Sequence, residues 1–274
     1  MSTEWYDLGR PAVMAIVNVT PDSFYAESRA FTAERLGERI RKAIDEGADV
    51  LDVGGYSTRP GADAVSECEE IDRVLRAVEA VRQVSSEIPI SIDTFRSEVV
   101  RRVVQAVGRV TVNDVTGGEA DPQLADLAAE YDLPYVVMHM RGTPQTMASL
   151  TQYTDVVAEV RAWLLQRAGA LRRRGVRRLV LDPGFGFAKT LEQNHALLGG
   201  LHRICSAGYP VLAALSRKSM IYKAINIAPE DALAGTTALN WEALRQGAAA
   251  LRVHDVKEAA QMVRLYEIYR KNCQ

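Results

Sequence analysis

Three acid or amide residues stand at the ends of apolar runs, and their chemistry suits a flat, polar ligand. They are Asp93 in SIDT, Asn113 in VTVND and Asp182 in LVLDPGFGF. A carboxylate accepts paired hydrogen bonds from a planar donor such as a 2-amino-pyrimidinone edge, and an amide both donates and accepts. Asp93, like Asp114, could instead cap a helix, a common use of Asp. The three residues together favour one shared binding site.

A second set of residues is cationic and suits an anionic ligand. The set comprises Arg59 in STRPG, Arg217 and Lys218 in SRKS, and Arg252 and His254 in RVHD. Arg binds oxyanions through a planar fork, whereas Lys acts as a point charge. The alternative is a set of solvated surface charges, but Arg252 stands between apolar residues and needs a partner. The set indicates a site for phosphate.

Two loops add to this inventory. Residues 18–24, which read NVTPDSF, are dense in small polar oxygens and suit Mg²⁺ already bound to a diphosphate, although a turn followed by a helix cap would look the same. Residues 184–190 read GFGFAKT and lack both the third glycine of a dinucleotide fingerprint and the GK[ST] spacing of a P-loop. We interpret this segment as a flexible loop with an aromatic lid over a flat ligand.

The elements that must position these residues are eight short apolar runs. They are VMAIVN, VLDVGG, IPISID, VTVND, YVVMHM, LVLDPG, VLAALS and ALRVHD, ending at Asn18, Gly55, Asp93, Asp114, Met140, Gly184, Ser216 and Asp255. Most are separated by segments with helical periodicity. Eight alternations of strand and helix predict a (β/α)8 TIM barrel. Such barrels place their chemistry at the carboxyl ends of the strands, where the polar residues above are expected to meet.

The helices of this barrel follow from apolar residues spaced three and four apart. The better-marked ones are expected at about 33–46, 155–174, 191–206, 229–246 and 256–270, with a loop over 20–32. Five arginines at positions 172–174, 177 and 178 fall at the end of one helix, opposite the predicted site, where positive charge suits the helix C-terminus.

Bulk properties fit one domain spanning residues 1–274, because a single barrel of this type needs about 250 residues. A net charge of −2 gives no sign of nucleic-acid binding. Three widely spaced cysteines read as reduced thiols of a cytoplasmic protein. Neither a secretion signal nor an apolar run of membrane-spanning length is expected.

The ordered motifs NVTPDSF, DVGGYSTRPGA, SIDT, VND, LDPGFGF, SRKSMI and RVHDV resemble dihydropteroate synthase of folate biosynthesis, from about Ala12 to the last helix. The resemblance implies a (β/α)8 barrel, a homodimer and a target of sulfonamide drugs. It also implies a transferase that joins 6-hydroxymethyl-7,8-dihydropterin diphosphate to p-aminobenzoate and releases diphosphate. A cationic pterin would form if diphosphate left first, and Asp93 would stabilise it.

The resemblance also implies residue roles. Asp93, Asn113, Asp182 and Lys218 would hold the pterin, with Met138 and Phe187 near its ring. Asn18 would bind Mg²⁺ with the diphosphate, which Thr58, Arg59, Arg252 and His254 would grip. Phe24, Pro60, Phe187 and Ser219 would frame the aminobenzoate. Asp93, Lys218, Arg252 and His254 would be the catalytic group.

The chain departs from the family pattern in two places. Residues 25–28 read YAES where relatives carry Ser-Asp-Gly-Gly, and Tyr56 stands where Glu is common. Loss of the glycines should stiffen the first loop. Two rival functions remain: a methyltransferase domain that binds methyltetrahydrofolate, which would not need SRKS and RVHD, and a non-enzymatic barrel that binds pterin or docks a partner.

Overall fold

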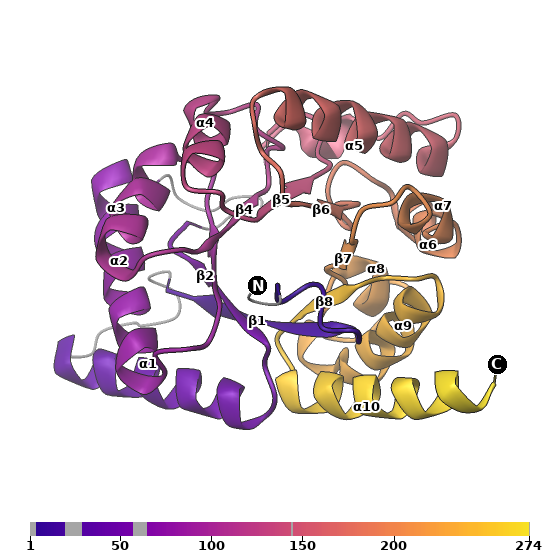
Figure 1. The fold of residues 1–274 in the computed structure, drawn as a ribbon. Coiled ribbons are helices and arrows are strands. Elements are labelled where there is room, and N and C mark those ends of the chain that lie inside the picture. The colour runs from indigo at the N-terminus through magenta and orange to yellow at the C-terminus, as the bar shows by residue number, and fades with distance from the viewer. Residues whose placement is uncertain (1–3, 20–28, 57–64, 144, 274) are drawn as a thin grey trace.

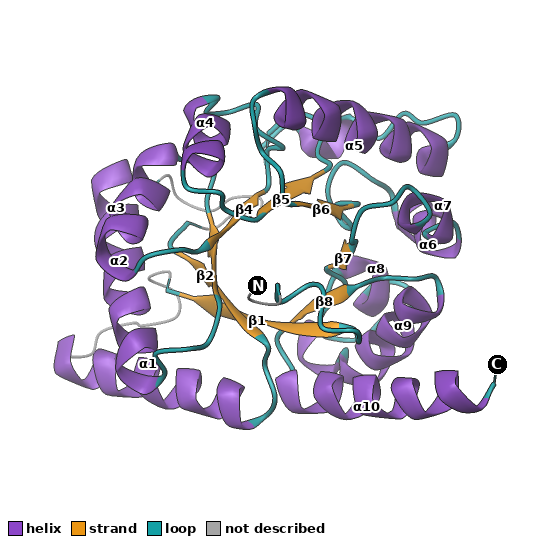
Figure 2. Ribbon diagram, viewed as in Figure 1, coloured by secondary structure: helices purple, strands orange, loops and turns teal. Residues whose placement is uncertain are grey.

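The computed structural model describes residues 4–19, 29–56, 65–143 and 145–273, without the side chains of 29–33. Eight parallel strands form a nearly closed ring surrounded by helices, which confirms the predicted (β/α)8 barrel (Figures 1 and 2). The strands are β1 (Ala12–Asn18), β2 (Val50–Gly54), β3 (Ile90–Asp93), β4 (Thr111–Asp114), β5 (Tyr135–Met138), β6 (Leu179–Asp182), β7 (Leu212–Ala213) and β8 (Ala250–Val253). Seven of them fall within one of the eight apolar runs, and β1 begins one residue before its run, at Ala12.

The sheet order is β6-β5-β4-β3-β2-β1-β8-β7, so chain neighbours are neighbours in the sheet and β1 pairs with β8. The ring closes between β6 and β7 through a parallel bridge at Leu181 and Val211. The Leu181 amide also donates to the carbonyl of Pro210, at 2.9 Å. All eight strands therefore point their carboxyl ends to one side.

The helices that cover the ring correct some predicted bounds. They are α1 (Arg29–Asp45), α2 (Glu67–Val84), α3 (Ser97–Val107), α4 (Gln123–Glu130), α5 (Val156–Arg173), α6 (Leu191–Gly199), α7 (His202–Cys205), α8 (Ser219–Tyr222), α9 (Leu233–Arg245) and α10 (Val256–Asn272), with short 3₁₀ turns at Met147–Ser149 and Pro229–Asp231. The first helix begins before residue 33. The helix expected over 191–206 is divided near Gly200, and the one expected from Pro229 begins at Leu233.

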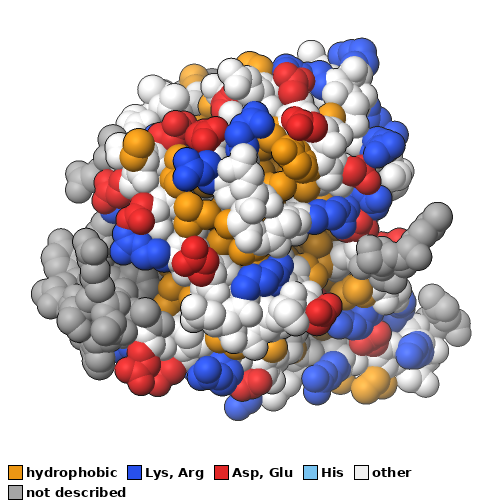
Figure 3. Space-filling view, turned by 60° about the vertical axis from the view of Figure 1, so that its left-hand side comes forward, with side chains coloured by type: hydrophobic (Ala, Val, Ile, Leu, Met, Phe, Trp, Pro, Cys, Tyr) orange, Lys and Arg blue, Asp and Glu red, His pale blue; other side chains and the backbone are white. Residues whose placement is uncertain are grey.

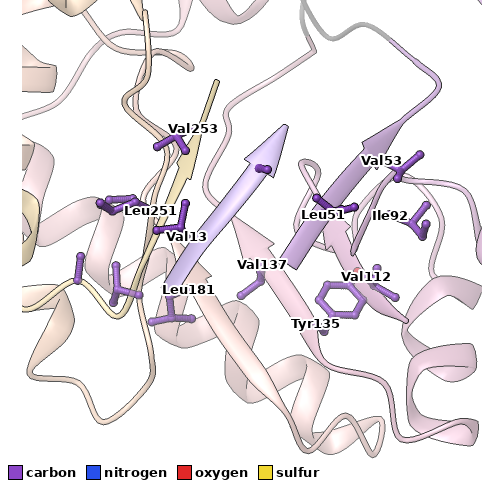
Figure 4. Packing of buried hydrophobic residues seen from close by; sticks show 14 of the residues in the cluster. Val13, Leu51, Val53, Ile92, Val112, Tyr135, Val137, Leu181, Leu251 and Val253 are labelled. Atoms are coloured by element: carbon purple, nitrogen blue, oxygen red, sulfur yellow. The ribbon is translucent and has the colours of Figure 1, made fainter. Parts of the chain in front are cut away.

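The barrel sorts its side chains by the period of two that a strand imposes. In β3, Ile90 and Ile92 pack in the layer between strands and helices, so Ser91 and Asp93 face the interior. Figure 4 shows this outer layer, with Ile92 near Leu51 and Val53. The same alternation turns the chemically active residues of the other strands inward.

The amino end of the barrel is filled by apolar side chains. Met14, Val136 and Val180 cluster there with Trp5, which reaches in from the N-terminal segment seen inside the ring in Figure 1. The indole Nε1 of Trp5 donates a 2.9 Å hydrogen bond to Oγ1 of Thr111. Because this end is packed, the carboxyl end is where a ligand can enter the barrel.

The arginine cluster near residues 172–178 is engaged in local contacts. Arg174 pairs with Asp126, both Arg177 and Arg178 pair with Asp132, and Arg178 also reaches Glu4. Acidic and basic side chains are interspersed over the face of the molecule in Figure 3. These ion pairs agree with the interpretation of the cluster as positive charge at the end of a helix, away from the predicted site.

Candidate active site

One row of inward-facing residues crosses four neighbouring strands at the carboxyl end. Asn18 on β1 is the register partner of Gly54 on β2, which is the partner of Asp93 on β3, which in turn is the partner of Asn113 on β4. On the other side of the barrel Met138 and Asp182 are register partners across β5 and β6. The strand register therefore places most of the predicted pterin ligands at one level.

Arg252 links this row across the barrel. Its Nε donates to Oδ2 of Asp52 at 2.6 Å, and its Nη2 donates to Oδ2 of Asp93 at 2.7 Å. Nδ2 of Asn113 donates to the same Asp52 carboxylate, at 3.1 Å to Oδ2. Asp52 is fully buried, so both of its donors shield it from solvent. One guanidinium is thus shared by two carboxylates.

Burial and charge act together on these groups. Burial raises the pKa of Asp93 to about 7, opposed by Arg252 and reinforced by Asp52. Burial works to lower the pKa of Arg252, but the charges of Asp52 and Asp93 outweigh it and raise that pKa above its ordinary value. The cluster therefore keeps a permanent cation beside a carboxyl group that titrates near neutrality.

Asp182 and Lys218 form the second charged group of the mouth. Oδ1 of Asp182 accepts a 2.7 Å hydrogen bond from the Gly184 amide, and burial raises the pKa of this carboxyl, with Lys218 opposing. Burial lowers the pKa of Lys218 to about 8, with Asp182 opposing. Lys218 Nζ donates to the carbonyl of Phe185 and lies 4.8 Å from the ring centroid of Phe187.

A cavity of about 570 Å³ opens next to this group. Its walls bring together Phe187, Lys218, Ser219 and His254, four of the residues predicted for substrate binding. The cavity is also lined by Met147, Phe185, Gly186, Arg217, Tyr222, Pro229 and Glu230. Lys218 borders this cavity and interacts electrostatically with Asp93 and Asp182, so the two charged groups share one mouth.

The ends of β7 and β8 are joined by hydrogen bonds. Nδ1 of His254 lies 3.0 Å from Oγ of Ser216, which also accepts from the His254 amide at 3.1 Å. Arg217, grouped by sequence with the candidate anion ligands, instead makes a fork with the Asp255 carboxylate, at 2.9 and 2.8 Å. Its Nη1 donates to the carbonyls of Pro229 and Glu230. Arg217 therefore connects the segment after β7 to Asp255 and to the turn at Pro229–Asp231.

Of the other predicted residues, Met138 is described by the structure and four are not. Met138 is buried in a cluster with Met140 and Met147, against which Phe187 packs. Phe24, Thr58, Arg59 and Pro60 lie outside the described residues, as does the atypical segment 25–28.

Asp114, weighed as a helix cap, faces outward and accepts from Tyr135 Oη and from the amides of Thr116 and Gly118. It holds a turn, while Asp93 faces the barrel interior.

Sequence reasoning missed two buried charged residues of the site. Asp52 stands inside the apolar run VLDVGG, and an acid at that depth of a parallel strand was itself a signal. Lys189 follows the glycine-rich loop and is 8% exposed. Its Nζ donates to the carbonyls of Gly184 and Phe187.

Asn18 offers a metal ion one amide oxygen. A Cβ built on Gly54 would lie 3.5 Å from Oδ1 of Asn18 and 3.6 Å from Oδ2 of Asp93, so both oxygens border the same small space. Among the residues that the structure describes, no group of three His, Cys, Asp or Glu side chains could enclose a metal. These donors fit a hard cation whose remaining oxygen ligands come from a substrate.

Comparison with known proteins agrees with this geometry. The family model described as pterin binding enzyme matches residues 14–254. The dihydropteroate synthase of Escherichia coli K12 is 42% identical over 266 residues, covering 95% of this chain and 92% of the relative.

Two solved structures are similar throughout. The dihydropteroate synthase of Xanthomonas albilineans with 4-aminobenzoic acid has a TM-score of 0.86 at 41% identity and covers 95% of this chain and 93% of its own. That of Yersinia pestis in complex with a sulfonamide drug has a TM-score of 0.89 at 36% identity, covering 97% and 96%. Within the described ranges, no helix has the length and apolar character of a membrane span.

Proposed function

The chain belongs to the pterin binding enzyme family, and from that membership we propose that it is a transferase with dihydropteroate synthase activity. It joins 6-hydroxymethyl-7,8-dihydropterin diphosphate to p-aminobenzoate and releases diphosphate. The observation that carries this proposal is the single mouth in which Asp93, Asp182 and Arg252 interact. A flat polar heterocycle, an anionic leaving group and an aromatic nucleophile each find matching chemistry there.

The pterin lies over the polar row. Asp182 is buried and has one oxygen engaged by the Gly184 amide, which leaves carboxylate lone pairs to accept from the 2-amino-pyrimidinone edge. Asn113 keeps its amide oxygen available as an acceptor while its nitrogen donates to Asp52. Met138 supplies an apolar surface for the ring, and Lys218, at the N-cap of α8, donates to it.

Diphosphate leaves toward the ends of β1 and β8. Arg252 carries a charge that its two carboxylate partners stabilise, and His254 stands beside it at the end of the same strand. Asn18 would contribute an amide oxygen to Mg²⁺, which would neutralise charge on the departing diphosphate. Thr58 and Arg59, which lie outside the described residues, are also assigned to the anion site.

Loss of diphosphate first leaves a cationic pterin methylene. Asp93 lies beside Arg252 with a second carboxylate nearby, so the local charge favours a cation once the anion has left. The aniline nitrogen of p-aminobenzoate then attacks, and it needs no strong base because the electrophile is already activated. Asp93 is therefore the residue that stabilises positive charge on the reacting carbon.

The aminobenzoate occupies the 570 Å³ cavity. Phe187 packs on its ring, Ser219 donates to its carboxylate at the start of α8, and Lys218 borders both substrates. Phe24 and Pro60, which lie outside the described residues, are also assigned to aminobenzoate binding. A sulfonamide drug competes for this cavity because its aniline and acidic group resemble those of the substrate.

The enzyme is a homodimer that pairs through α10. The large apolar side chains of α10 divide into two sets. Met262 is buried, and Tyr266 Oη donates to the carbonyl of Leu244. Leu265, Ile268 and Tyr269 are 59%, 61% and 45% exposed. Three large apolar side chains on one helix suit a second copy of the same surface. The three free thiols agree with a cytoplasmic location.

The deciding experiment incubates the purified protein with both substrates and Mg²⁺ and measures dihydropteroate by chromatography. Product formation is expected, and its absence under these conditions rejects the proposal. Calorimetric titration with methyltetrahydrofolate separates the methyltransferase rival, which would bind it more tightly than the pterin diphosphate. Tight binding of pterin diphosphate without turnover would support the non-enzymatic rival.

A further inference from the structure

The turn that joins β6 to α6 has a costly backbone. Gly184, Gly186 and Ala188 have φ values of 67°, 83° and 49°. The left-handed conformation is easy for glycine but unfavourable for an L-residue such as Ala188. Such a turn persists only where surrounding contacts stabilise it.

Lys189 supplies those contacts from inside the turn. Its Nζ donates to the carbonyl of Gly184 at 2.8 Å and to that of Phe187 at 2.9 Å, and lies 3.1 Å from Nδ1 of His139. The side chain is 8% exposed, and His139 is 1% exposed. Lys189 therefore contacts both ends of the turn and His139, the residue that follows β5.

His139 acts here as a neutral acceptor. Burial, with the charge of Lys189 second, lowers the pKa of His139 to about 2, so the ring carries no charge at neutral pH. An acceptor at Nδ1 requires that the ring proton be on Nε2. The ring also meets Trp163 edge to face, with centroids 5.1 Å apart, which fixes its position.

The turn that Lys189 holds presents three groups to Asp182 and Lys218, the residues assigned above to substrate binding. The Gly184 amide donates to Asp182, the Phe185 carbonyl accepts from Lys218, and the Phe187 ring faces Lys218 in the cavity wall. The turn is thus tied down rather than the flexible lid expected from its glycines. Any change in its shape must move the wall of the aminobenzoate cavity.

We propose that Lys189, braced by His139, is a positioning residue that shapes the cavity for p-aminobenzoate by fixing the turn 184–188. This inference rests on the proposed function for the identity of the ligand. Lys189 touches no reacting atom in this proposal. It acts through Phe187 and Lys218, which border the cavity directly.

The test replaces Lys189 with Met, which keeps the length of the side chain and removes its donors. The KM for p-aminobenzoate should rise by about tenfold or more, because two carbonyls lose their hydrogen-bond donor, while kcat at saturation changes by less than about threefold. Lys223→Met is the matched control, since Lys223 is exposed at the end of α8 in the same region, and its KM should equal that of the wild type.

A second variant separates positioning from general loss of structure. If Lys189 and His139 act as one unit, Lys189→Met and His139→Leu should together raise the KM less than the product of the two single effects. A fall in kcat with unchanged KM, in a variant that still melts cooperatively, would overturn the proposal. Independent effects of the two changes would also overturn the part assigned to His139.

Hydrogen exchange of the protein alone makes the test independent of turnover. Mass spectrometry of a peptide covering residues 183–190 should show faster amide exchange in Lys189→Met than in the wild type and in Lys223→Met. Unchanged exchange would overturn the proposal even if the enzyme is active. A wild-type protein that makes no dihydropteroate, yet shows the difference in exchange, would reject the proposed function and retain the pinning of the turn.

Discussion

Arg252 and Asp93 are joined by a 2.7 Å hydrogen bond from Nη2 to Oδ2, although 159 positions separate them in the chain. Strands β8 and β3 are not neighbours in the sheet, so this contact crosses the barrel mouth. Asp52 accepts from Nε of the same guanidinium at 2.6 Å, which gives two carboxylates to one cation. Because two buried carboxylates share one guanidinium, the site can stabilise a further positive charge.

The first prediction follows from that charge. Asp93→Asn keeps the shape of the side chain and removes the charge that stabilises a cationic pterin, so kcat should fall by about 10²- to 10³-fold. Binding of the pterin diphosphate, measured by calorimetry, should largely survive. Exposed Asp126 provides the control, and Asp126→Asn should leave kcat unchanged. Equal turnover in Asp93→Asn and the wild type would remove Asp93 from the mechanism.

A second prediction concerns stability against pH. The pKa of Asp93 is about 7 in the folded protein and 3.8 for the free side chain, so between these values the folded state binds more protons. The contribution of this group to stability is therefore complete below about pH 4 and is lost as pH rises through 7.

Asn carries no charge at any of these pH values. The Tm of Asp93→Asn should exceed that of the wild type by a few degrees at pH 8, and the difference should shrink toward pH 4. Asp126 shifts the other way, because Arg174 lowers its pKa, so Asp126→Asn should not raise the Tm at pH 8. A Tm difference for Asp93→Asn that is constant across this range would contradict the burial argument.

The third prediction tests Asp52. Asp52→Ala leaves Arg252 with one carboxylate partner and Asn113 Nδ2 without its acceptor, in a place closed to solvent. The free energy of unfolding in urea should fall by about 3 kcal/mol, as when a buried ion pair loses one partner. Asp72→Ala breaks an exposed pair with Arg76 and should cost less than about 1 kcal/mol. Equal costs for the two variants would contradict the structural role of Asp52.

Much of this architecture could be predicted because strand and helix periods differ. Each apolar run is too short for a helix, and the segments between most of them repeat at three and four, which fixed the barrel. The polar ends of the runs then located Asp93, Asn113 and Asp182. The sequence left open whether Asp93 and Asp114 cap helices or bind a ligand. The alternation of side chains along each strand answers this: Asp93 faces the barrel interior and Asp114 faces outward.

The remainder depended on contacts between distant parts of the chain. The partnership of Arg217 with Asp255 could not be read from SRKS, because it requires the ends of β7 and β8 to lie side by side. The break falls near Gly200, where a Cβ would lie 2.7 Å from Cγ2 of Val157 in α5, a contact that the local sequence does not show. No role could be assigned to Lys189 from the sequence, because its partners are carbonyl groups that only the folded turn brings to its Nζ.

The fourth prediction addresses the dimer. Ile268→Glu places a charge in the exposed apolar patch of α10, so sedimentation should show a monomer where the wild type shows a dimer. Tyr131→Glu is the control, because Tyr131 is 39% exposed at the end of α4 and belongs to no such patch. A dimer that persists in Ile268→Glu, or a monomeric wild type, would rule out pairing through this surface.

The last prediction separates two costs at one glycine. Gly184 has φ 67° and a Cβ there would overlap the carbonyl oxygen of His139, whereas Gly9 has φ 72° with nothing within 4 Å of the same position. Gly9→Ala therefore pays only the left-handed backbone, about 1 kcal/mol of unfolding free energy. Gly184→Ala should cost several times more and should also raise the KM for p-aminobenzoate, because its amide holds Asp182 and its carbonyl holds Lys189. If the two variants are equally stable in urea, the turn can move away from His139, which contradicts a rigid cavity wall.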